Sequence, residues 1–363
     1  MRFPEFTGEW KMATFGDIAK GFDYGMNAAA KSFDGNNKYI RITDIDEVSS
    51  QYLYDDVVSP DGELEDRYLV KENDILLART GASTGKSYLY RNSDGKLYFA
   101  GFLIRANIYK HNSYFVFSQL HTLRYKKWIS VMSARSGQPG INSQEYASFP
   151  VYTTSLQEED KIATFLKLLD ERIITQNKII EKYESLIKGI AQNVARNNKP
   201  NIRLSECLEC SSSTLQESDV CENGTYPVYG ANGIVGYLDN YNAEKEAVYI
   251  IKDGSGVGTV SYVTGKCSAT GTLNTLQAKE GYSLQYLYYM LKVFNFEPYK
   301  TGMAIPHIYF KDYGKAKIFC PSYTEQLKYV GVLSTIDNKL SAEQSILTDL
   351  SLQKQYLLHQ MFI

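Results

Sequence analysis

Two stretches of the sequence repeat each other, and this repeat constrains the fold more than any other feature. The first stretch runs from about Ser155 to Ala195 and the second from about Ser322 to Met361; a shift of 167 positions superimposes them without a gap. Each opens with Ser-x-x-Glu, the pattern of a capping box, in which the serine hydroxyl accepts from a free amide and the glutamate reaches back. We therefore expect two matched helices, each roughly 60 Å long at ~1.5 Å per residue.

Apolar residues recur in heptads along both predicted helices. The first helix has the seams Leu166, Ile173, Ile180, Ile187, Val194 and Ile162, Leu169, Gln176, Tyr183, Ile190. The second has Leu333, Leu340, Leu347, Lys354, Met361 and Tyr329, Ile336, Glu343, Leu350, Leu357. Seams of this length favour coiled-coil pairing over the alternative, an amphipathic helix laid on a globule. The charge of Lys354 departs from the pattern, and we expect it near a frayed helix end.

Two polar residues occupy matched seam positions near the middle of the helices, Gln176 in the first and Glu343 in the second. In an antiparallel pair related by a central two-fold axis, these residues fall in adjacent layers. Buried polar residues in a seam lower stability but can specify register and orientation. We therefore expect Gln176 and Glu343 to lie near each other in an antiparallel, intramolecular coil; the alternative is that both simply reach water.

The segments before the two helices also repeat each other. Both contain a short helical entry, a buried strand with a glycine-rich turn, a helix and a Gly/Pro breaker, in that order. The expected fold is mixed α/β, with two similar domains, each followed by a long helix, and pseudo-two-fold symmetry. The predicted boundaries are 1–154 and 198–321 for the domains and 155–197 and 322–363 for the helices.

The glycine-rich turn of the first domain, Gly81 to Ser87, resembles a phosphate-binding loop. It is one residue short of that motif, and the strand-like run from Tyr88 follows it where a phosphate site needs a helix. The matching turn of the second domain, Gly254 to Gly258, lacks the Lys-Ser pair. The repeated feature is a base, Arg79 or Lys252, before two glycines, which predicts a tight hairpin and disfavours an autonomous nucleotide-dependent enzyme.

Composition excludes several classes of protein. No apolar run is long enough to span a membrane, and the start of the sequence has no signal-peptide character. Five cysteines are sparse and odd in number, which favours a reducing cytoplasm. Cys207-x-x-Cys210 has no further ligands at zinc spacing, so no metal site is expected. The net charge of −2 gives the chain no overall positive charge to attract DNA, which counts mildly against a nucleic-acid-binding protein.

Basic residues are nevertheless concentrated in one stretch of each domain. No acid occurs between Asp94 and Glu145, where seven bases lie, and four lysines face one aspartate between Pro298 and Pro321. Such a run is often only solvated surface, but its length favours a phosphate-facing side. No nucleophile elbow, amino-methylation motif or metal spacing is present in the sequence. The chain is therefore predicted to bind rather than to catalyse.

The order of these features resembles the specificity subunit of type I restriction-modification systems. The resemblance covers essentially the whole chain and rests on Trp10, Phe15–Ile18, Asp74–Gly81, Asp253–Gly258, Ala304–Ile308 and the helix openings Glu158–Ala163 and Glu325–Lys328. It implies two target-recognition domains that each read one half of a bipartite, asymmetric sequence in double-stranded DNA. It also implies that the helices space the domains and dock two modification subunits. Translocating restriction subunits are then expected to join this assembly.

The resemblance further implies a cytoplasmic, non-enzymatic chain without a cofactor, since S-adenosylmethionine, ATP and Mg belong to the partner subunits. A coiled-coil scaffold whose globules bind proteins or glycans is the alternative. Residues in or beside the glycine turns or the basic stretches are expected at the DNA face: Arg79, Arg105, Arg135, Gln138, Lys252, Lys300 and His307. Among them, Arg and Gln can read base edges, whereas Lys more often binds phosphate.

Overall fold

The computed structural model describes residues 2–134, 139–302 and 305–362. The chain forms two compact units. Unit 1 comprises Met1–Asn177 and Ser345–Ile363, and unit 2 comprises Lys178–Gln344. Each unit therefore contains one globule together with about half of each long helix.

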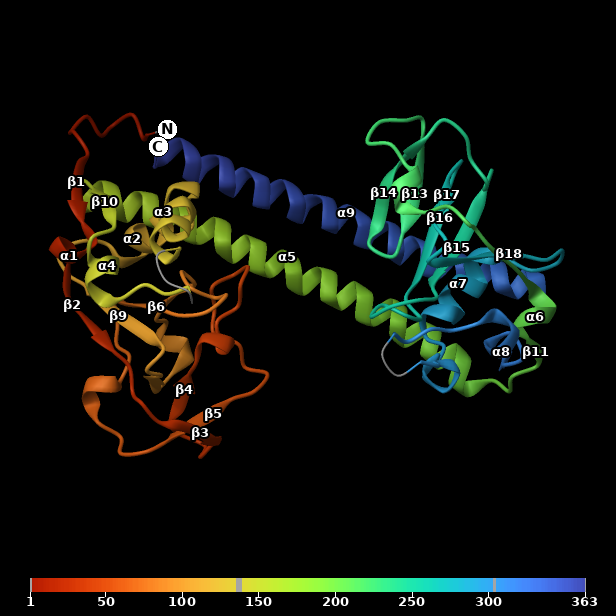
Figure 1. Ribbon diagram of the computed structural model, residues 1–363, viewed down its shortest axis with the longest axis horizontal. Coiled ribbons are helices and arrows are strands. Elements are labelled where there is room, and N and C mark those ends of the chain that lie inside the picture. The colour runs from red at the N-terminus through yellow and green to blue at the C-terminus, as the bar shows by residue number, and fades with distance from the viewer. Residues whose placement is uncertain (1, 135–138, 303–304, 363) are drawn as a thin grey trace. The chain divides into compact units, whose positions relative to one another are not determined.

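The two long helices are α5 (Leu156–Asn197) and α9 (Tyr323–Met361), labelled in Figure 1. Their bounds agree with the predicted helices to within about two residues. Seam residues such as Leu166, Ile187 and Leu333 are at most 2% exposed. The heptad pattern therefore identified the buried faces correctly.

The starts of the two helices differ from the predicted capping boxes. The Glu158 amide donates to the Ser155 hydroxyl over 3.4 Å. The Glu158 carboxylate instead accepts from Arg2, at 2.6 and 2.7 Å, and from the Trp10 indole at 3.0 Å. In α9, the Ser322 hydroxyl donates to Glu325 at 2.9 Å. The serine part of the first box is confirmed, and Glu325 reaches back to the Ser322 hydroxyl, whereas the Glu158 carboxylate binds donors remote in sequence.

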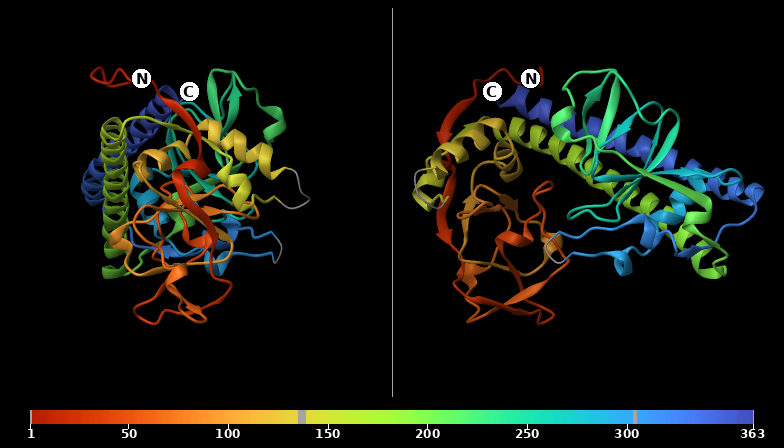
Figure 2. Two further views of the ribbon diagram at one scale, coloured as in Figure 1. Left: turned by 90° about the vertical axis from the view of Figure 1, so that its left-hand side faces the viewer. Right: turned by 45° about the vertical axis from the view of Figure 1, so that its right-hand side comes forward.

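In unit 1 the start of α5 packs against the end of α9, so the helices are antiparallel there, as predicted. Ile162 and Leu166 share a core with Leu358 and Phe362. The Trp10 ring lies 5.7 Å from that of Phe362, which holds the N-terminal segment beside the end of α9 (Figures 1 and 2).

The sequence predicts Lys354 near a frayed helix end, but the structure does not place it there. Its ammonium lies 2.5 Å from the Asp170 carboxylate of α5, with about a quarter of each side chain exposed. The Tyr114 hydroxyl donates to the other oxygen of Asp170 at 2.5 Å. A specific ion pair therefore accommodates the charge in the seam.

The globule of unit 1 is built on a four-stranded antiparallel sheet in the order β2-β9-β6-β7. Smaller sheets pair β1 with β10, β3 with β5 and β4 with β8. The strands are β1 (Lys11–Thr14), β2 (Ala19–Tyr24), β3 (Ala29–Ser32), β4 (Lys38–Ile40), β5 (Val58–Asp61), β6 (Asp74–Ala78), β7 (Ser87–Leu89), β8 (Leu97–Phe99), β9 (Leu103–Ile108) and β10 (Pro150–Thr153). The short helices are α1 (Phe15–Ile18), α2 (Ser113–Gln119), α3 (Leu123–Ser133) and α4 (Ser143–Ala147).

The globule of unit 2 repeats this plan, with the sheet β12-β18-β15-β16 and the terminal pair β11 with β19; β14-β13-β17 form a further sheet. The strands are β11 (Ile202–Arg203), β12 (Leu208–Ser212), β13 (Tyr226–Gly230), β14 (Gly233–Leu238), β15 (Glu246–Ile251), β16 (Val260–Thr264), β17 (Ser268–Ala269), β18 (Leu273–Ala278) and β19 (Lys317–Ile318). The helices are α6 (Leu204–Cys207), α7 (Leu284–Lys292) and α8 (Phe310–Tyr313).

The apolar pattern of the sequence predicts one continuous strand over Phe99–Ile108 and one continuous helix over Asn112–Met132, but the structure interrupts both. The predicted strand Phe99–Ile108 turns between β8 and β9, where the Leu103 amide donates to the Ala100 carbonyl. The predicted helix from Asn112 to Met132 divides into α2 and α3, because the Thr122 hydroxyl caps the second helix. Hydrophobic periodicity carries across such a short break, so the pattern did not reveal either interruption.

Candidate nucleic-acid interface

In unit 1 the glycine-rich turn joins two antiparallel strands, β6 and β7, and is therefore the predicted hairpin rather than a phosphate-binding loop. Gly81 and Gly85 adopt φ angles of 74° and 95°, a conformation that favours glycine. Outside the hairpin, the Gly81 amide donates to the Pro139 carbonyl, and the Ile141 amide donates to the Arg79 carbonyl. This arrangement of the hairpin and its docked segment, 139–141, is called cradle 1 here.

Unit 2 contains the same arrangement, made of the β15–β16 hairpin and residues 305–308, and called cradle 2. Gly254 and Gly258 have φ angles of 96° and 91°. The Gly254 amide donates to the Pro306 carbonyl, and the Ile308 amide donates to the Lys252 carbonyl. Each backbone bond of cradle 1 named above has a counterpart here, so the internal duplication extends to individual hydrogen bonds.

Four of the seven predicted DNA-contacting residues lie at the two cradles. Arg79 directly follows β6 in cradle 1, and Lys252 directly follows β15 at the matching position in cradle 2. His307 belongs to the docked segment, where its backbone exchanges two hydrogen bonds with Thr301. Lys300 precedes Thr301 and forms a 2.6 Å ion pair with Glu297. The structure thus brings Lys252, Lys300 and His307 to one cradle.

The other three predicted residues are not placed there. Arg105 lies on β9, donates to Asp23 at 2.8 Å and to the Leu69 carbonyl at 3.2 Å, and its side chain is 14% exposed. It is therefore neutralised within the protein, and its contact with DNA stays a prediction. Arg135 and Gln138 lie outside the described residues.

Two of the seven bases in the acid-free stretch of unit 1, Arg105 and Arg124, are held within the protein, and the phosphate-facing side stays a prediction. The Arg124 guanidinium stacks 4.5 Å from the Tyr152 ring and 5.3 Å from the Phe149 ring. Burial lowers the pKa of Arg124. Arg124 and the paired Arg105 show that counting charges along the sequence overstates the number of cations available at the surface.

Sequence reasoning missed the aromatic side chains beside cradle 1. Tyr24 and Phe102 are 42% and 58% exposed, and the Arg79 guanidinium lies 4.9 Å and 6.0 Å from their rings. The Ser143 amide donates to the Tyr24 hydroxyl at 3.3 Å, and hydrogen bonding to Ser143, through its side chain more than its amide, lowers the pKa of Tyr24. These residues come from separate strands and turns, so only the pairing of strands could have joined them.

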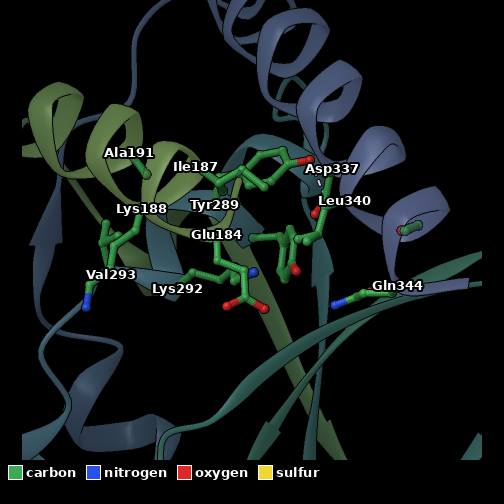
Figure 3. A pocket seen from close by; sticks show the side chains of 12 residues that line it. Glu184, Ile187, Lys188, Ala191, Tyr289, Lys292, Val293, Asp337, Leu340 and Gln344 are labelled. Atoms are coloured by element: carbon green, nitrogen blue, oxygen red, sulfur yellow. Dashed lines mark hydrogen bonds between the residues drawn. The ribbon is translucent and has the colours of Figure 1, made fainter. Parts of the chain in front are cut away.

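Each unit also has a groove between its globule and its helix halves. The groove of unit 2 has a volume of about 500 Å³, and in it the Tyr289 hydroxyl donates to Asp337 at 3.2 Å (Figure 3). The groove of unit 1 has a volume of about 710 Å³. The α5 and α9 residues that line the unit 2 groove are Glu184, Ile187, Lys188, Ala191, Asp337, Leu340, Ser341 and Gln344.

Every one of those eight positions, shifted by 167, lines the groove of unit 1. The corresponding residues are Ser351, Lys354, Gln355, Leu358, Asp170, Ile173, Ile174 and Asn177. The aspartate is kept, since Asp170 and Asp337 both accept from a tyrosine hydroxyl of the globule. The two grooves are therefore repeat-related surfaces, each formed within one unit.

Other features bear on alternative functions. Among the described residues, no three His, Cys, Asp or Glu side chains are grouped so that they could hold a metal ion. The five cysteines are free thiols, and Cys207 is fully buried. No helix in the described part of the chain is long and apolar enough to cross a membrane.

Comparison with known proteins agrees with this duplicated design. The family model of the type I restriction modification DNA specificity domain matches residues 7–185 and again 200–351. The specificity subunit of the type I restriction enzyme EcoprrI from Escherichia coli is 27% identical over 116 residues. That alignment covers 32% of this chain and 29% of the relative, so the chain spans less than a third of that protein in the match.

Solved structures show the same fold across the whole chain. The type I restriction-modification S subunit from M. genitalium matches with a TM-score of 0.67 at 18% identity, covering 98% of this chain and 96% of that one. A chain from a study of complex assembly and conformational transition in the type I R-M system matches with a TM-score of 0.51 at 15% identity, covering 97% of each. Because the family model covers most of the sequence in two successive copies, the chain belongs to the type I restriction modification DNA specificity family.

Proposed function

We propose that this chain is the DNA-recognition subunit of a cytoplasmic type I restriction-modification complex, in which each domain reads one half of a bipartite, asymmetric DNA site. The observation that carries the proposal is the repeated cradle. One chain presents two loop pairs with the same backbone bonds but with different residues at the matched positions, Arg79 and Lys252. Two similar readers with different side chains suit two different half-sites.

The cradles have the physical properties of a nucleic-acid surface. Each combines a basic residue with glycines that leave room for a close approach, since nothing lies within 4 Å of a Cβ built at Gly81 or Gly254. Phosphate contacts supply affinity, whereas side chains that reach base edges supply sequence specificity. Near-zero net charge is compatible with this function, because only the local charge at the cradles faces the DNA.

The repeat-related grooves support the docking of two copies of one partner, which we assign to the modification subunits. Eight matched positions on α5 and α9 contribute to each groove, so one partner surface could use both. In this proposal S-adenosylmethionine, ATP and Mg²⁺ are bound by the modification and restriction subunits. The chain itself neither methylates nor cuts DNA.

The test is to purify the chain alone and in complex with its cognate modification subunits, and to assay both for DNA methylation. We expect adenine methylation at a two-part site with the complex and none with the chain alone. Strong methylation by the single chain would contradict the proposal. So would the absence of sequence-specific, salt-sensitive DNA binding by the complex.

A domain exchange tests whether the two readers are independent. Residues 1–154 are replaced by the corresponding domain of another family member, while Arg2 and Trp10 are kept because they contact Glu158 of α5 and Phe362. One half of the methylated site should change and the other should stay. If both halves change, the domains are not separate readers.

A further inference from the structure

One side chain of cradle 1 is held in a fixed orientation. The Arg79 guanidinium lies between Tyr24 and Phe102, 4.9 Å and 6.0 Å from the ring centres. The Ser143 amide, at the start of α4, holds the Tyr24 hydroxyl. Stacking on aromatic rings restricts a planar guanidinium more than it restricts a lysine ammonium, so Arg79 needs little reorganisation before it binds a ligand.

Arg79 is not held in place by an ion pair within the described part of the protein. No carboxylate in the described part of the chain forms an ion pair with Arg79, whose guanidinium lies against the Tyr24 side chain. Arg105 shows the contrasting case, because its guanidinium is occupied by Asp23 and by the Leu69 carbonyl. Arg79 therefore keeps donors available for a ligand that brings its own acceptors.

The backbone on both sides of Arg79 is also fixed. Its amide donates to the Phe102 carbonyl at 3.1 Å, and its carbonyl accepts from the Ile141 amide at 2.9 Å. Gly81, two residues on, has open space on the side where a Cβ would stand. A fork of parallel N–H donors on a rigid, open loop matches the O6 and N7 acceptors of guanine in the major groove.

Cradle 2 has the same backbone but no such clamp. The strand pairings of the two sheets place Ser212 where unit 1 has Tyr24, and Thr272 where it has Phe102. The Lys252 amide donates to the Thr272 carbonyl, as that of Arg79 does to Phe102. The three positions thus read Tyr, Arg and Phe in one domain and Ser, Lys and Thr in the other.

We propose that Arg79 reads a guanine in the half-site of the first domain, positioned by Tyr24 and Phe102, and that Lys252 makes no equivalent readout in the second. This inference rests on the proposed function and refines it, since it names the base and the residue. A lysine is a compact point charge that more often binds phosphate. The two half-sites should therefore differ in how they are read.

The test uses the complex of the full chain with its cognate modification subunits and a DNA library randomised over the target. The wild-type complex should require guanine at one position of one half-site. Arg79→Lys keeps the charge but loses the fork, so the preference for guanine there, on the order of 10- to 100-fold, should fall close to one. The other half-site should be selected as before, which shows that the variant complex is folded.

Further variants separate readout from structure. Tyr24→Ala should weaken the guanine preference, and Tyr24→Phe, which keeps the ring, should restore most of it. Lys252→Ala should lower affinity for all sequences equally and reduce the salt dependence by about one unit. Replacing the guanine with 7-deazaguanine, which lacks the N7 acceptor, should weaken wild-type binding and leave Arg79→Lys unaffected.

Two failures can be told apart. If the wild-type complex selects no bipartite sequence, the proposed function is wrong. If it selects one and Arg79→Lys keeps every base preference, only the assignment of Arg79 is overturned. Equal loss of affinity for all sequences in Arg79→Lys would also overturn it, because that result identifies a phosphate contact.

Discussion

The two cradles share their backbone bonds and differ in the side chains that those bonds present. Arg79 in unit 1 and Lys252 in unit 2 have the same main-chain partners, yet only Arg79 lies between aromatic rings. A duplicated backbone holds the loop, while its side chains are free to diverge. The comparison shows that backbone atoms determine the geometry of the loop, whereas side-chain atoms determine what the loop can recognise.

The starts of the long helices show the same contrast in the supporting structure. Glu159 is fully buried and accepts from the Asn112 amide at 2.9 Å and from His111 at 2.8 Å. Its counterpart, Gln326, is 1% exposed and accepts from the Ser283 amide at 2.8 Å. Both side chains tie the globule's helix to the long helix, but only one carries a charge.

The largest expected effect sharpens this second comparison. Glu159→Ala leaves the His111 ring and the backbone amides of Asn112 and Thr154 without their acceptor, which should lower the free energy of unfolding by about 3 kcal/mol or more. Gln326→Ala should cost about 1–2 kcal/mol, and Glu159→Gln should lie between them. Denaturant unfolding with coincident probes measures all three. Equal losses at the two sites would show that the charge contributes nothing.

The second prediction concerns the loss of stability in acid that is caused by one histidine of unit 1. His121 of unit 1 accepts from the Ser50 hydroxyl and donates to the Phe117 carbonyl, and burial together with nearby Lys354 lowers its pKa to about 4. As pH falls below about 6.5, the unfolded chain takes up a proton that the folded one does not. This group should therefore reduce stability by up to about 1.4 kcal/mol per pH unit down to about pH 4.

The measurement is the pH dependence of unfolding for the wild type and His121→Gln, which removes the titrating ring. The difference in stability between the two proteins should change with pH below 6.5 and stay constant above it. Parallel pH profiles would mean that His121 can be protonated without loss of the fold.

The long helices were predictable because a heptad pattern over some forty residues reports a buried face directly. The hairpins were predictable because paired glycines after a buried strand need positive φ angles, as Gly81 and Gly254 confirm. Both features depend on residues close together in sequence. The capping boxes were predicted less well, because Arg2 and Trp10, remote in sequence, compete for Glu158.

The clamp around Arg79 was not predictable from the sequence. Its three side chains come from β2, the residue after β6 and the turn before β9, and only the strand register brings them together. The same limit explains Arg105, whose partner Asp23 lies 82 positions away. Counting charges along a chain cannot distinguish a cation that faces a ligand from one that is already paired.

A smaller effect is expected at the seam position where the repeats differ in charge. Lys354, paired with Asp170, corresponds to Ile187 of the first helix. Lys354→Ile copies the other repeat and should change the free energy of unfolding by no more than about 1 kcal/mol, since a partly exposed ion pair contributes little. Lys354→Ala, which also removes the packed side chain, is the matched control and should be the less stable variant. A loss of several kcal/mol in Lys354→Ile would show that the ion pair is essential to the helix pair.

The smallest effect on stability concerns Gln176 and Glu343, whose proximity stays a prediction. Gln176 is 7% exposed, and Glu343 is half-buried. Leucine at both positions should leave the free energy of unfolding within about 1 kcal/mol, because apolar residues replace buried polar ones at little cost.

The property that should change in the double leucine variant is the register of the two helices. In a background without the native cysteines, Ile162→Cys should crosslink to Met361→Cys, since these ends share one core. In the double leucine variant, part of the crosslink should move one heptad, to Lys354→Cys, because no polar residue then specifies the register. An unchanged crosslink pattern would show that the globules, rather than this polar pair, fix how the helices align.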